Sequence, residues 1–432
     1  MRPAAELGIV PYVATATGSD LSTPISNPAA ATGPWLRLAA LSGALASALA
    51  VASGALGLGI AHRVLVVLGL PPLVALVVAA RVAYPRLLRP AVVALGLLIA
   101  ESAVGGVVAL GGNPDWAAGL HFAVAGLALA AALLAAAACY QGDPLPAGPW
   151  RDYVTLTKPR IMSLLLLTAA AGMFAGAQGV PDLAKLAALL VGGALASGGA
   201  SALNHLLDRD IDARMGGRTS SRPLVSGRVA PPRALEFGLV LSAFSFVLLG
   251  CAINVLTALL ALVGSLGYVL VYTLWLKRTT PQNIVIGGAA GAVPPLVGWA
   301  AATGDVTIPA LLLFAIVFVW TPPHFWALAL LIKDNYRAAG VPMLPVVRGE
   351  RETARQIVVY SAALVAVTLL PWAWGTAGLV YLSCALALGA VFIWLAERLR
   401  RETSSRRAVF LFHYSLLYLA LLFAALALDP VL

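Results

Sequence analysis

The stretch LAKLAALLVGGALASGGASALNHLLDRDID, residues 183–212, joins a long apolar run to a cluster of polar side chains. Residues 186–203 contain no charged side chain, and a run of about 20 apolar residues is long enough to cross a bilayer as a helix. The run ends at Asn204, Asp208 and Asp212, which stand four residues apart. This pattern indicates a membrane helix that ends in a polar site.

Similar apolar runs recur along the whole chain. Of its 432 residues, 61% are hydrophobic and 11% are charged, against about 25% charged in ordinary globular domains. This composition excludes a soluble protein, a disordered protein and a nucleic-acid-binding surface, and the continuous runs exclude the alternating strands of a β-barrel. We predict an all-α polytopic membrane protein with about 13 transmembrane helices, at residues 38–60, 64–80, 91–111, 118–138, 161–178, 186–203, 234–252, 255–275, 284–302, 308–331, 357–373, 377–395 and 408–428.

The basic residues predict the orientation of the chain in the membrane. The formal net charge is +10, and every Lys and Arg except Arg63 and Lys185 falls on one side of these spans, together with the N-terminus. An excess of Lys and Arg in cytoplasmic loops is the rule for membrane proteins. We therefore predict a multi-pass protein of the plasma membrane, with its N-terminus in the cytoplasm and its C-terminus outside.

Composition also divides the chain into three parts. Residues 1–34 are polar, lack an apolar core and are predicted to form a disordered cytoplasmic tail. The proline-rich residues 141–159 separate a four-helix transmembrane unit, residues 35–145, from a nine-helix unit, residues 146–432. The second unit gathers its polar residues in the inner loops, and function in membrane proteins concentrates where polar groups meet the spans.

The first polar cluster has the chemistry of a diphosphate site. On one continuous helix Asn204, Asp208 and Asp212 would share a stripe about 80° wide and about 12 Å long. Carboxylates at this spacing repel each other unless a cation lies between them, and Mg²⁺, with Mn²⁺ as a substitute, prefers carboxylate and phosphate oxygens. Arg218 and Arg222 follow, and guanidinium groups bind phosphate well. The alternative is a solvated loop in which acids balance arginines, and we favour that alternative for the neighbouring Arg209 and Asp210.

Two further inner loops carry polar residues that could complete such a site. Lys277 and Arg278 end one span, and Lys333, Asp334 and Arg337 end another. His324 lies about two turns inside that second span, beside a Pro-Pro pair and among aromatic residues that include Trp326. A buried histidine of this kind is a packed core residue or a substrate contact, and the sequence does not choose between them.

At these residues the chain resembles a known family. Residues 150–430 are similar to the UbiA superfamily of intramembrane prenyltransferases, and within it to the haem O synthase branch. The matching motifs are Leu156–Arg160, Asn204–Asp212, Arg218-Thr219 with Arg222-Pro223, Leu276–Gly288, Pro322–Trp326 and Asp334–Pro345. Many superfamily members carry a second pair of aspartates, but here the position four residues after Asp334 is Ala338. The resemblance therefore leaves open whether one or two Mg²⁺ ions bind.

The resemblance implies a nine-helix bundle and a farnesyl transfer reaction. Farnesyl diphosphate and haem b would be the substrates, and the vinyl group of haem b would attack the allylic cation left when diphosphate departs. The implied metal ligands are Asn204, Asp208, Asp212 and Asp334. The implied diphosphate ligands are Lys158, Arg218, Arg222, Lys277 and Lys333, and the candidates for contact with haem are His205, His324 and Trp326. A separate haem A synthase or an oxidase assembly factor is a potential partner.

The four-helix unit has two histidines at similar depth. His62 and His121 lie near the starts of two parallel spans, so both could ligate one haem b from opposite sides. The flanking segments resemble half of a haem A synthase, but the glutamate that the catalytic half places three residues before the first histidine is replaced by Gly59. The alternative is that both histidines are bonded to loop carbonyls. Glu101, in the middle of a span, needs a partner that the sequence does not identify.

Two other functions were weighed against haem farnesylation. A UbiA-type enzyme could prenylate another acceptor, such as an aromatic acid or a lipid alcohol, but the motifs around Lys277 and His324 favour haem. A transporter is disfavoured, because transporters usually show an internal repeat with interrupted helices at the membrane midplane. In this chain the polar residues cluster at the inner ends of the spans instead.

Overall fold

The computed structural model describes residues 34–55, 59–82, 84, 87–110, 115–139 and 148–432. The predicted tail, residues 1–34, therefore lies almost wholly outside the described residues. Within the described ranges every regular element is helical, as expected for a chain whose apolar backbone must satisfy its hydrogen bonds inside a bilayer.

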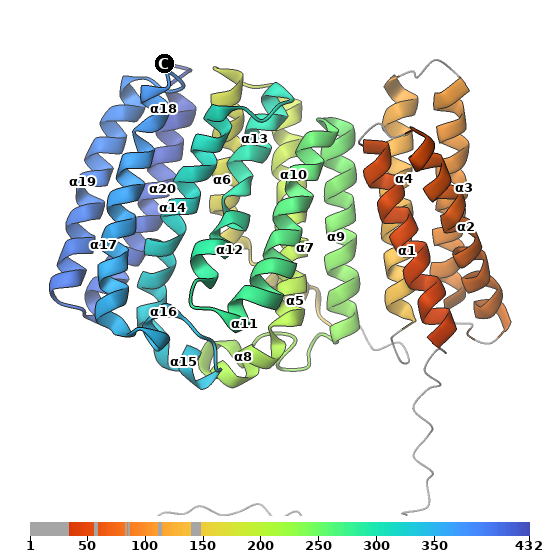
Figure 1. Ribbon diagram of the computed structural model, residues 1–432, viewed down its shortest axis with the longest axis horizontal. Helices are drawn as coiled ribbons and strands as arrows, with labels where there is room; N and C mark the ends of the chain where they lie inside the picture. The colour runs from red at the N-terminus through yellow and green to blue at the C-terminus, as the bar shows by residue number, and fades with distance from the viewer. Residues whose placement is uncertain (1–33, 56–58, 83, 85–86, 111–114, 140–147) are drawn as a thin grey trace, which may run out of the picture.

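The N-terminal unit consists of four neighbouring helices (Figure 1). They are α1 (Pro34–Ala55), α2 (Gly59–Val82), α3 (Leu88–Leu110) and α4 (Asp115–Ala138). Small residues such as Ala40, Ala80 and Ala91 are fully buried between them and let the helix backbones approach closely. On its outer side α4 packs against the second unit through Phe122, whose ring lies 5.0 Å from that of Phe246.

The C-terminal unit crosses the membrane nine times. Its long helices are α6 (Pro159–Ala177), α7 (Leu183–Leu207), α9 (Pro231–Ala252), α10 (Val255–Leu266), α14 (Ile308–Leu331), α17 (Gly349–Thr368), α19 (Leu379–Arg401) and α20 (Ser405–Leu428). α10 continues through a π-helix, η3 (Gly267–Leu276), into α11 (Lys277–Thr279). α12 (Asn283–Gly291) and α13 (Val293–Thr303) form one further span, and α18 (Leu370–Ala373) extends α17.

These helices confirm the predicted fold class. Twelve helices in the described ranges are long and apolar enough to cross a membrane, and α1 is a further apolar helix of 22 residues. The chain is a multi-pass membrane protein. The sequence analysis predicted about 13 spans. Twelve are found in the described ranges, and α1 is the candidate for the thirteenth.

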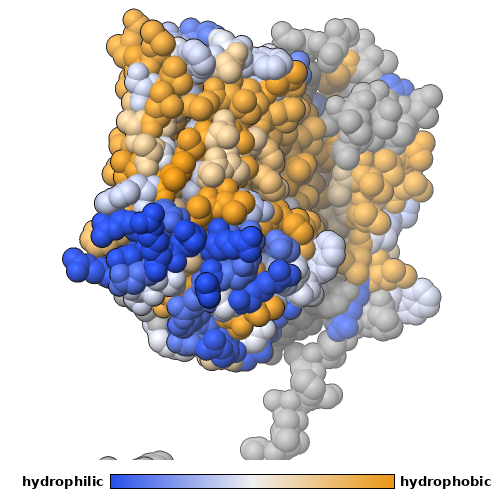
Figure 2. Space-filling model, turned by 60° about the vertical axis from the view of Figure 1, so that its left-hand side comes forward, coloured by the Kyte–Doolittle hydropathy of each residue, from blue (hydrophilic) through white to orange (hydrophobic). Residues whose placement is uncertain are grey.

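The short helices gather at one end of the bundle. They are α5 (Trp150–Leu156), α8 (Arg209–Met215), η2 (Gly217–Thr219), α15 (Lys333–Ala338) and α16 (Leu344–Val347). Figure 1 shows α8, α15 and α16 at the end opposite the C-terminus. Figure 2 shows this end covered by hydrophilic residues beneath a hydrophobic belt. The predicted inner loops therefore share one face of the molecule.

Close backbone contact joins α6 to α13 in the centre of this unit. A Cβ atom at Gly298 would stand 1.8 Å from the carbonyl oxygen of Ala169, and one at Gly172 would stand 2.4 Å from the carbonyl oxygen of Pro295. Only glycine fits at such a distance, because no side chain has to be accommodated. The two helices are therefore in direct backbone contact inside the bundle.

Candidate active site

The three oxygen-bearing residues of the first cluster lie together in the interior. Asn204 is 3% exposed, Asp208 1% and Asp212 2%. They do not share one straight helix, as the sequence analysis assumed. α7 ends at Leu207, Asp208 caps it with φ −87° and ψ 0°, and Asp212 belongs to α8. The backbone N–H of Asp212 still donates to Asp208 at 2.8 Å, so the chain turns at Asp208 while keeping the helical spacing.

Three cations converge on these side chains from three other segments. Lys158 Nζ donates to Asn204 Oδ1 at 2.7 Å, and Lys277 Nζ donates to Asp208 Oδ2 at 2.5 Å. The Arg222 guanidinium donates to Asp212 Oδ2 at 2.5 Å. A second link joins the first two groups, because Asn204 Nδ2 donates to Asp208 Oδ2 at 2.8 Å. Residues separated by up to 120 positions in the sequence therefore form one hydrogen-bonded cluster, the Asp208 cluster.

Lys158 reaches this cluster through an unusual backbone conformation. It has φ +50° and ψ 59°, in the left-handed region, and Pro159 follows as the first residue of α6. A non-glycine residue in this region costs about 1–2 kcal/mol, a strain that is common at functional sites. Burial, together with the nearby charges of Arg222 and Lys277, lowers the pKa of Lys158 to about 7.

The π-helix η3 supplies the opposite wall of the cluster. Thr273 accepts a hydrogen bond from Asn204 Nδ2 at 3.0 Å and donates one to the carbonyl of Tyr268, five residues earlier, at 2.9 Å. A π-helix has more residues per turn than an α-helix, which changes the direction in which the following side chains point. Both Thr273 and Lys277 therefore face α7. Single π-turns occur frequently at functional sites. Sequence reasoning missed Thr273, because a π-helix has no simple sequence signature.

Several buried polar atoms beside the cluster have no hydrogen-bond partner in the part of the chain that the structure describes. They include Asp208 Oδ1 and both ring nitrogens of His205. His205 is 3% exposed and lies within the field of Lys158, Arg222 and Lys277. Unsatisfied buried groups are costly and therefore rare, so these atoms point to a ligand position at this place.

The second predicted loop is close by, but its charged groups point elsewhere. The Asp334 carboxylate is 74% exposed and accepts a hydrogen bond from Arg337 at 2.5 Å. Lys333 is paired with Glu350, which raises the pKa of the lysine. The structure therefore does not bring Asp334 or Lys333 onto the Asp208 cluster. Asn335 does connect the two loops, because its Nδ2 donates to the carbonyl of Met215 in α8 at 2.8 Å.

Tyr336 is the residue of that loop which faces the cluster. It is 6% exposed, and its hydroxyl lies within the field of Arg222, Asp208 and Asp212. Burial raises the pKa of Tyr336 well above its ordinary value, so the phenol stays protonated and can donate a hydrogen bond. The sequence analysis passed over this tyrosine, whose only signal was its place between Asp334 and Arg337.

The remaining charged residues near the cluster form surface pairs or anchors. Asp210 accepts hydrogen bonds from Arg214 and Arg278, and the bond from Arg278 lowers the pKa of Asp210. This is the charge balance favoured from sequence. Arg228 binds Asp152 with two hydrogen bonds of 2.9 and 3.1 Å and so ties the loop that carries Arg222 to α5. The side chain of Arg218 lies outside the described residues; its backbone belongs to η2.

His324 and Trp326 lie in the packed part of α14. The His324 ring stacks between Trp320 and Phe412, with centroids 4.3 and 4.9 Å away, and its Nδ1 bonds to the Ser415 hydroxyl at 2.6 Å. Trp326 is 2% exposed, and its Nε1 has no partner within the described ranges. The structure places neither side chain in hydrogen-bond contact with the Asp208 cluster.

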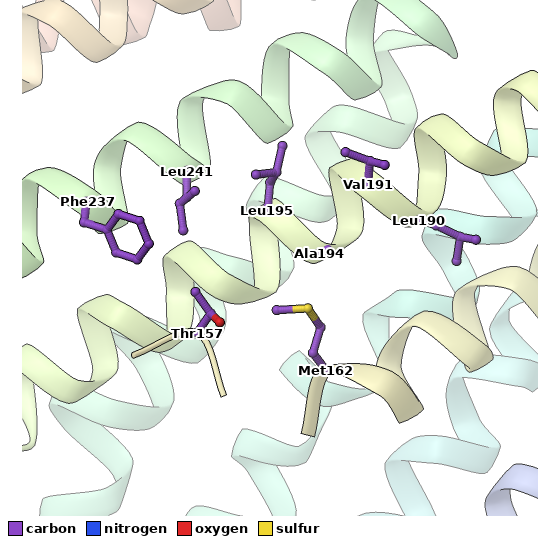
Figure 3. Close-up of a pocket in the computed structure, with 8 residues that line it drawn as sticks. All are labelled: Thr157, Met162, Leu190, Val191, Ala194, Leu195, Phe237 and Leu241. Carbon is purple, nitrogen blue, oxygen red and sulfur yellow. The ribbon is translucent and has the colours of Figure 1, made fainter. Parts of the chain in front are cut away.

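An apolar groove of about 370 Å³ opens between α6, α7 and α9 (Figure 3). Its walls include Met162, Leu195, Phe237 and Leu241, and its polar end is Thr157, the neighbour of Lys158. The groove contains none of the residues that the sequence predicted for the site. It is a hydrophobic depression on the surface of the bundle beside the polar end.

In the N-terminal unit the structure brings together His62, His121 and Glu101. The Nε2 atoms of His62 and His121 lie 3.4 and 3.5 Å, respectively, from the same carboxylate oxygen, Glu101 Oε1. The two imidazoles are therefore the neighbours of Glu101 that the sequence could not identify. The two Nδ1 atoms contact backbone carbonyls, those of Ala50 and Glu101.

Comparison with known proteins assigns the C-terminal unit to a family. Residues 165–417 match the model of the UbiA prenyltransferase family. The chain is 54% identical over 280 residues to the protoheme IX farnesyltransferase of Thermus thermophilus, covering 65% of this chain and 46% of that one. It is 52% identical over 280 residues to the protoheme IX farnesyltransferase of Alkalilimnicola ehrlichii, covering 65% of this chain and 92% of that one. The chain therefore belongs to the UbiA prenyltransferase family.

Solved structures show the same fold. A digeranylgeranylglyceryl phosphate synthase superposes with a TM-score of 0.55 and 18% identity, over 65% of this chain and 98% of that one. A UbiA homologue from Archaeoglobus fulgidus gives a TM-score of 0.50 with 18% identity, over 64% of this chain and 99% of that one. The chain spans about half the length of the Thermus thermophilus relative.

Proposed function

We propose that the C-terminal unit transfers a farnesyl group from farnesyl diphosphate to a vinyl group of haem b, which gives haem O. The observation that carries this proposal is the buried Asp208 cluster, in which two carboxylates and an amide meet three cations at the polar end of an apolar bundle. The identities above 50% to protoheme IX farnesyltransferases support haem b as the acceptor.

The residues of the cluster fit a magnesium ion. Asp208 Oδ1 is a buried carboxylate oxygen without a hydrogen bond in the described structure, and Asn204 and Asp212 add oxygen donors nearby. Mg²⁺ and Mn²⁺ take such oxygens together with phosphate oxygens of a substrate. The charges also agree, because the two carboxylates and three cations leave one excess positive charge, and a magnesium diphosphate carries about one negative charge.

In this proposal the cations act on the leaving group. Lys277 and Arg222 pair with the carboxylates of Asp208 and Asp212, and Lys158 donates to the amide oxygen of Asn204. If a metal bound these oxygens, each cation could turn its N–H groups to the diphosphate oxygens. Mg²⁺ would supply charge neutralisation of the departing diphosphate. Donors that are fixed in place where negative charge develops are the main source of electrostatic catalysis. Thr273, which bonds to Asn204, and the Tyr336 hydroxyl are close enough to help keep the side chains of the Asp208 cluster in position.

The bond changes follow from the chemistry of an allylic diphosphate. The C1–O bond of farnesyl diphosphate breaks, and its electron pair leaves with the diphosphate. The haem vinyl group attacks the allylic cation, and water then adds to the resulting carbocation and releases a proton. The apolar helices around the site keep water away from the first cation. Of the three candidates for haem contact, His205 is the one beside the cluster, with both ring nitrogens unpartnered among the described residues.

Further parts of the proposal concern the second loop and the surroundings of the protein. Asp334 and Lys333 join the site only if α15 shifts towards it, and the contact between Asn335 and Met215 already holds α15 against α8. Arg218 stays a proposed diphosphate ligand. We place the protein in the plasma membrane, with the N-terminus and the Asp208 cluster facing the cytoplasm. The product would pass to a separate haem A synthase or an oxidase assembly factor.

One assay tests the reaction directly. Purified protein in detergent is incubated with haem b, farnesyl diphosphate and Mg²⁺, and the haem fraction is analysed by mass spectrometry. We expect a haem product that has gained one farnesyl group and one hydroxyl group. A protein that leaves haem unchanged, yet prenylates an aromatic acid or a lipid alcohol, would overturn the assignment of the acceptor but keep the prenyl transfer.

The haem b that the sequence predicts in the N-terminal unit conflicts with the position of the Glu101 carboxylate. A bis-histidine haem needs the two Nε2 atoms on opposite faces of the porphyrin, each about 2 Å from the iron. A point about 3.5 Å from both nitrogens, where Glu101 Oε1 lies, would then fall within the macrocycle, about 2.8 Å from the iron. A haem therefore requires Glu101 to move, and no step of the proposed reaction uses this group.

A further inference from the structure

The residues His62, Glu101 and His121, here called the two-histidine cluster, come from three different helices. They belong to α2, α3 and α4, and one nitrogen or oxygen of each lies within 4.8 Å of the others. α2 and α4 both begin at the end of the unit where α1 ends, so the cluster lies towards the membrane face opposite the Asp208 cluster. Nothing in the proposed farnesyl transfer uses these three side chains.

The hydrogen bonds of the imidazole rings orient both histidines in the same way. His62 Nδ1 lies 2.8 Å from the carbonyl oxygen of Ala50, and His121 Nδ1 lies 3.2 Å from that of Glu101. A carbonyl oxygen can only accept, so each Nδ1 carries a proton, and in the neutral imidazole each Nε2 then presents its lone pair. A metal-binding histidine usually donates its other ring N–H to a carboxylate, a backbone carbonyl or water.

The carboxylate between the rings lacks any other compensation. Glu101 is 2% exposed, and neither of its oxygens has a hydrogen-bond partner among the described residues. A buried ionised group within a membrane span is costly unless a charge of opposite sign accompanies it. If both histidines present lone pairs, neither can donate to the carboxylate from Nε2. A cation at the centre of the cluster satisfies all three groups at once.

We propose that the two-histidine cluster binds one divalent transition-metal ion of the zinc type, through His62 Nε2, His121 Nε2 and Glu101 Oε1. Zinc lies about 2.0–2.2 Å from such ligands, which places tetrahedral ligands about 3.3–3.5 Å apart. The observed distances of 3.4 and 3.5 Å from Glu101 Oε1 to the two nitrogens match this spacing. Three protein ligands leave one position open for water or another small ligand.

The packing around His121 limits the positions that its imidazole ring can take. A Cβ atom at Gly105, one turn beyond Glu101 on α3, would stand 2.8 Å from His121 Cε1. The imidazole of His121 therefore rests against the bare backbone of α3 at Gly105. Because Glu101 Oε1 lies 3.4 and 3.5 Å from the two Nε2 atoms, where a porphyrin would have to lie, we assign a single small ion rather than haem to the cluster.

The test measures metal content in the full-length protein. Protein without an affinity tag is dialysed against EDTA, loaded with Zn²⁺ or Co²⁺, passed through a desalting column and analysed by mass spectrometry of the metals. The Co²⁺ form also reports its geometry, because tetrahedral cobalt absorbs strongly in the visible range. Variants Glu101→Gln and His121→Gln remove one ligand each, and His413→Gln is the matched control. His413 is an exposed histidine of α20 whose Nδ1 bonds to the carbonyl of Val409.

We expect about one metal ion per chain in the unchanged protein and in His413→Gln, and at least a tenfold lower content in the other two variants. Equal metal content in all four proteins would overturn the proposal. Haem b is offered in a parallel reconstitution, and a Soret band that disappears in His121→Gln would likewise overturn it in favour of haem. Retained farnesyl transfer in Glu101→Gln and His121→Gln shows that these variants are folded. If one of them is inactive, the result is read from the other variant and from Gly105→Ala, which should lower the metal content by displacing His121.

Discussion

Replacing Asp208 with asparagine should abolish most of the activity while leaving the shape of the side chain almost unchanged. The substitution removes one negative charge from a group that is 1% exposed and that accepts from Lys277 Nζ at 2.5 Å. Lys277 is itself only 8% exposed, so its charge would stay buried without its partner. The variant would also lose the carboxylate oxygen Oδ1 that we propose for the metal.

The size of the effect follows from the burial of the pair. Removing one partner of a buried ion pair costs about 3–5 kcal/mol, and each 1.4 kcal/mol is a factor of ten. We therefore expect kcat/KM for farnesyl transfer to fall by about 10²–10⁴-fold at saturating haem b. The loss should be smaller at high Mg²⁺ if Asp212 and Asn204 still hold the metal weakly. Product is quantified by mass spectrometry of the haem fraction.

The matched control is Asp210→Asn, two residues further along the same stretch. The Asp210 carboxylate is 48% exposed and pairs with Arg214 and Arg278 on the surface, where such pairs contribute little. We expect Asp210→Asn to keep its activity to within about twofold. Equal activity of Asp208→Asn and Asp210→Asn, with both proteins folded by size-exclusion chromatography, would refute the placement of the active site at the Asp208 cluster.

Three other outcomes follow from the structure. Gly298→Ala should lower the free energy of unfolding by about 1–3 kcal/mol or more, because its Cβ would collide with a backbone carbonyl of α6, whereas Gly291→Ala, with open space around it, should leave the melting temperature unchanged. Asp152→Asn removes the charge and one of the two bonds to Arg228 and loosens the loop that follows α8, so the KM for farnesyl diphosphate should rise several-fold at constant kcat, while Glu236→Gln should change neither. Chelation with EDTA should stop turnover without loss of helical circular dichroism, and Mg²⁺ or Mn²⁺ should restore it; turnover that persists in EDTA would contradict the metal proposal.

Much of the fold was predictable because membrane helices are local structures. A span satisfies its own backbone hydrogen bonds, so the length of an apolar run is enough to identify it. Twelve of the predicted spans correspond to helices that meet the membrane criteria, and α1 corresponds to the remaining one. The predicted boundaries were less accurate at the inner ends. The span predicted to begin at residue 357 is part of a helix that begins at Gly349, because Glu350, Glu352 and their basic neighbours are polar but still helical.

The site was predictable only in part. The spacing of Asn204, Asp208 and Asp212 led to the correct cluster of buried side chains, because four-residue spacing keeps groups on one side of a helix. The turn of the chain at Asp208 and the π-helix that carries Thr273 were not predictable from that spacing. Asp334 was chosen for its charge, yet in the structure it is Tyr336 of the same loop that faces the carboxylates.

Hydropathy and the positions of the basic residues were enough to predict that this protein crosses the membrane many times and gathers its polar residues at one end. Both act along the chain, and no neighbouring helix is needed to interpret them. Which charges meet depends instead on the packing of distant segments. Lys158, Arg222 and Lys277 come from separate segments, and so do His62, Glu101 and His121. Such contacts depend on how helices pack against one another, and packing is set by the shapes of many side chains together rather than by any local pattern.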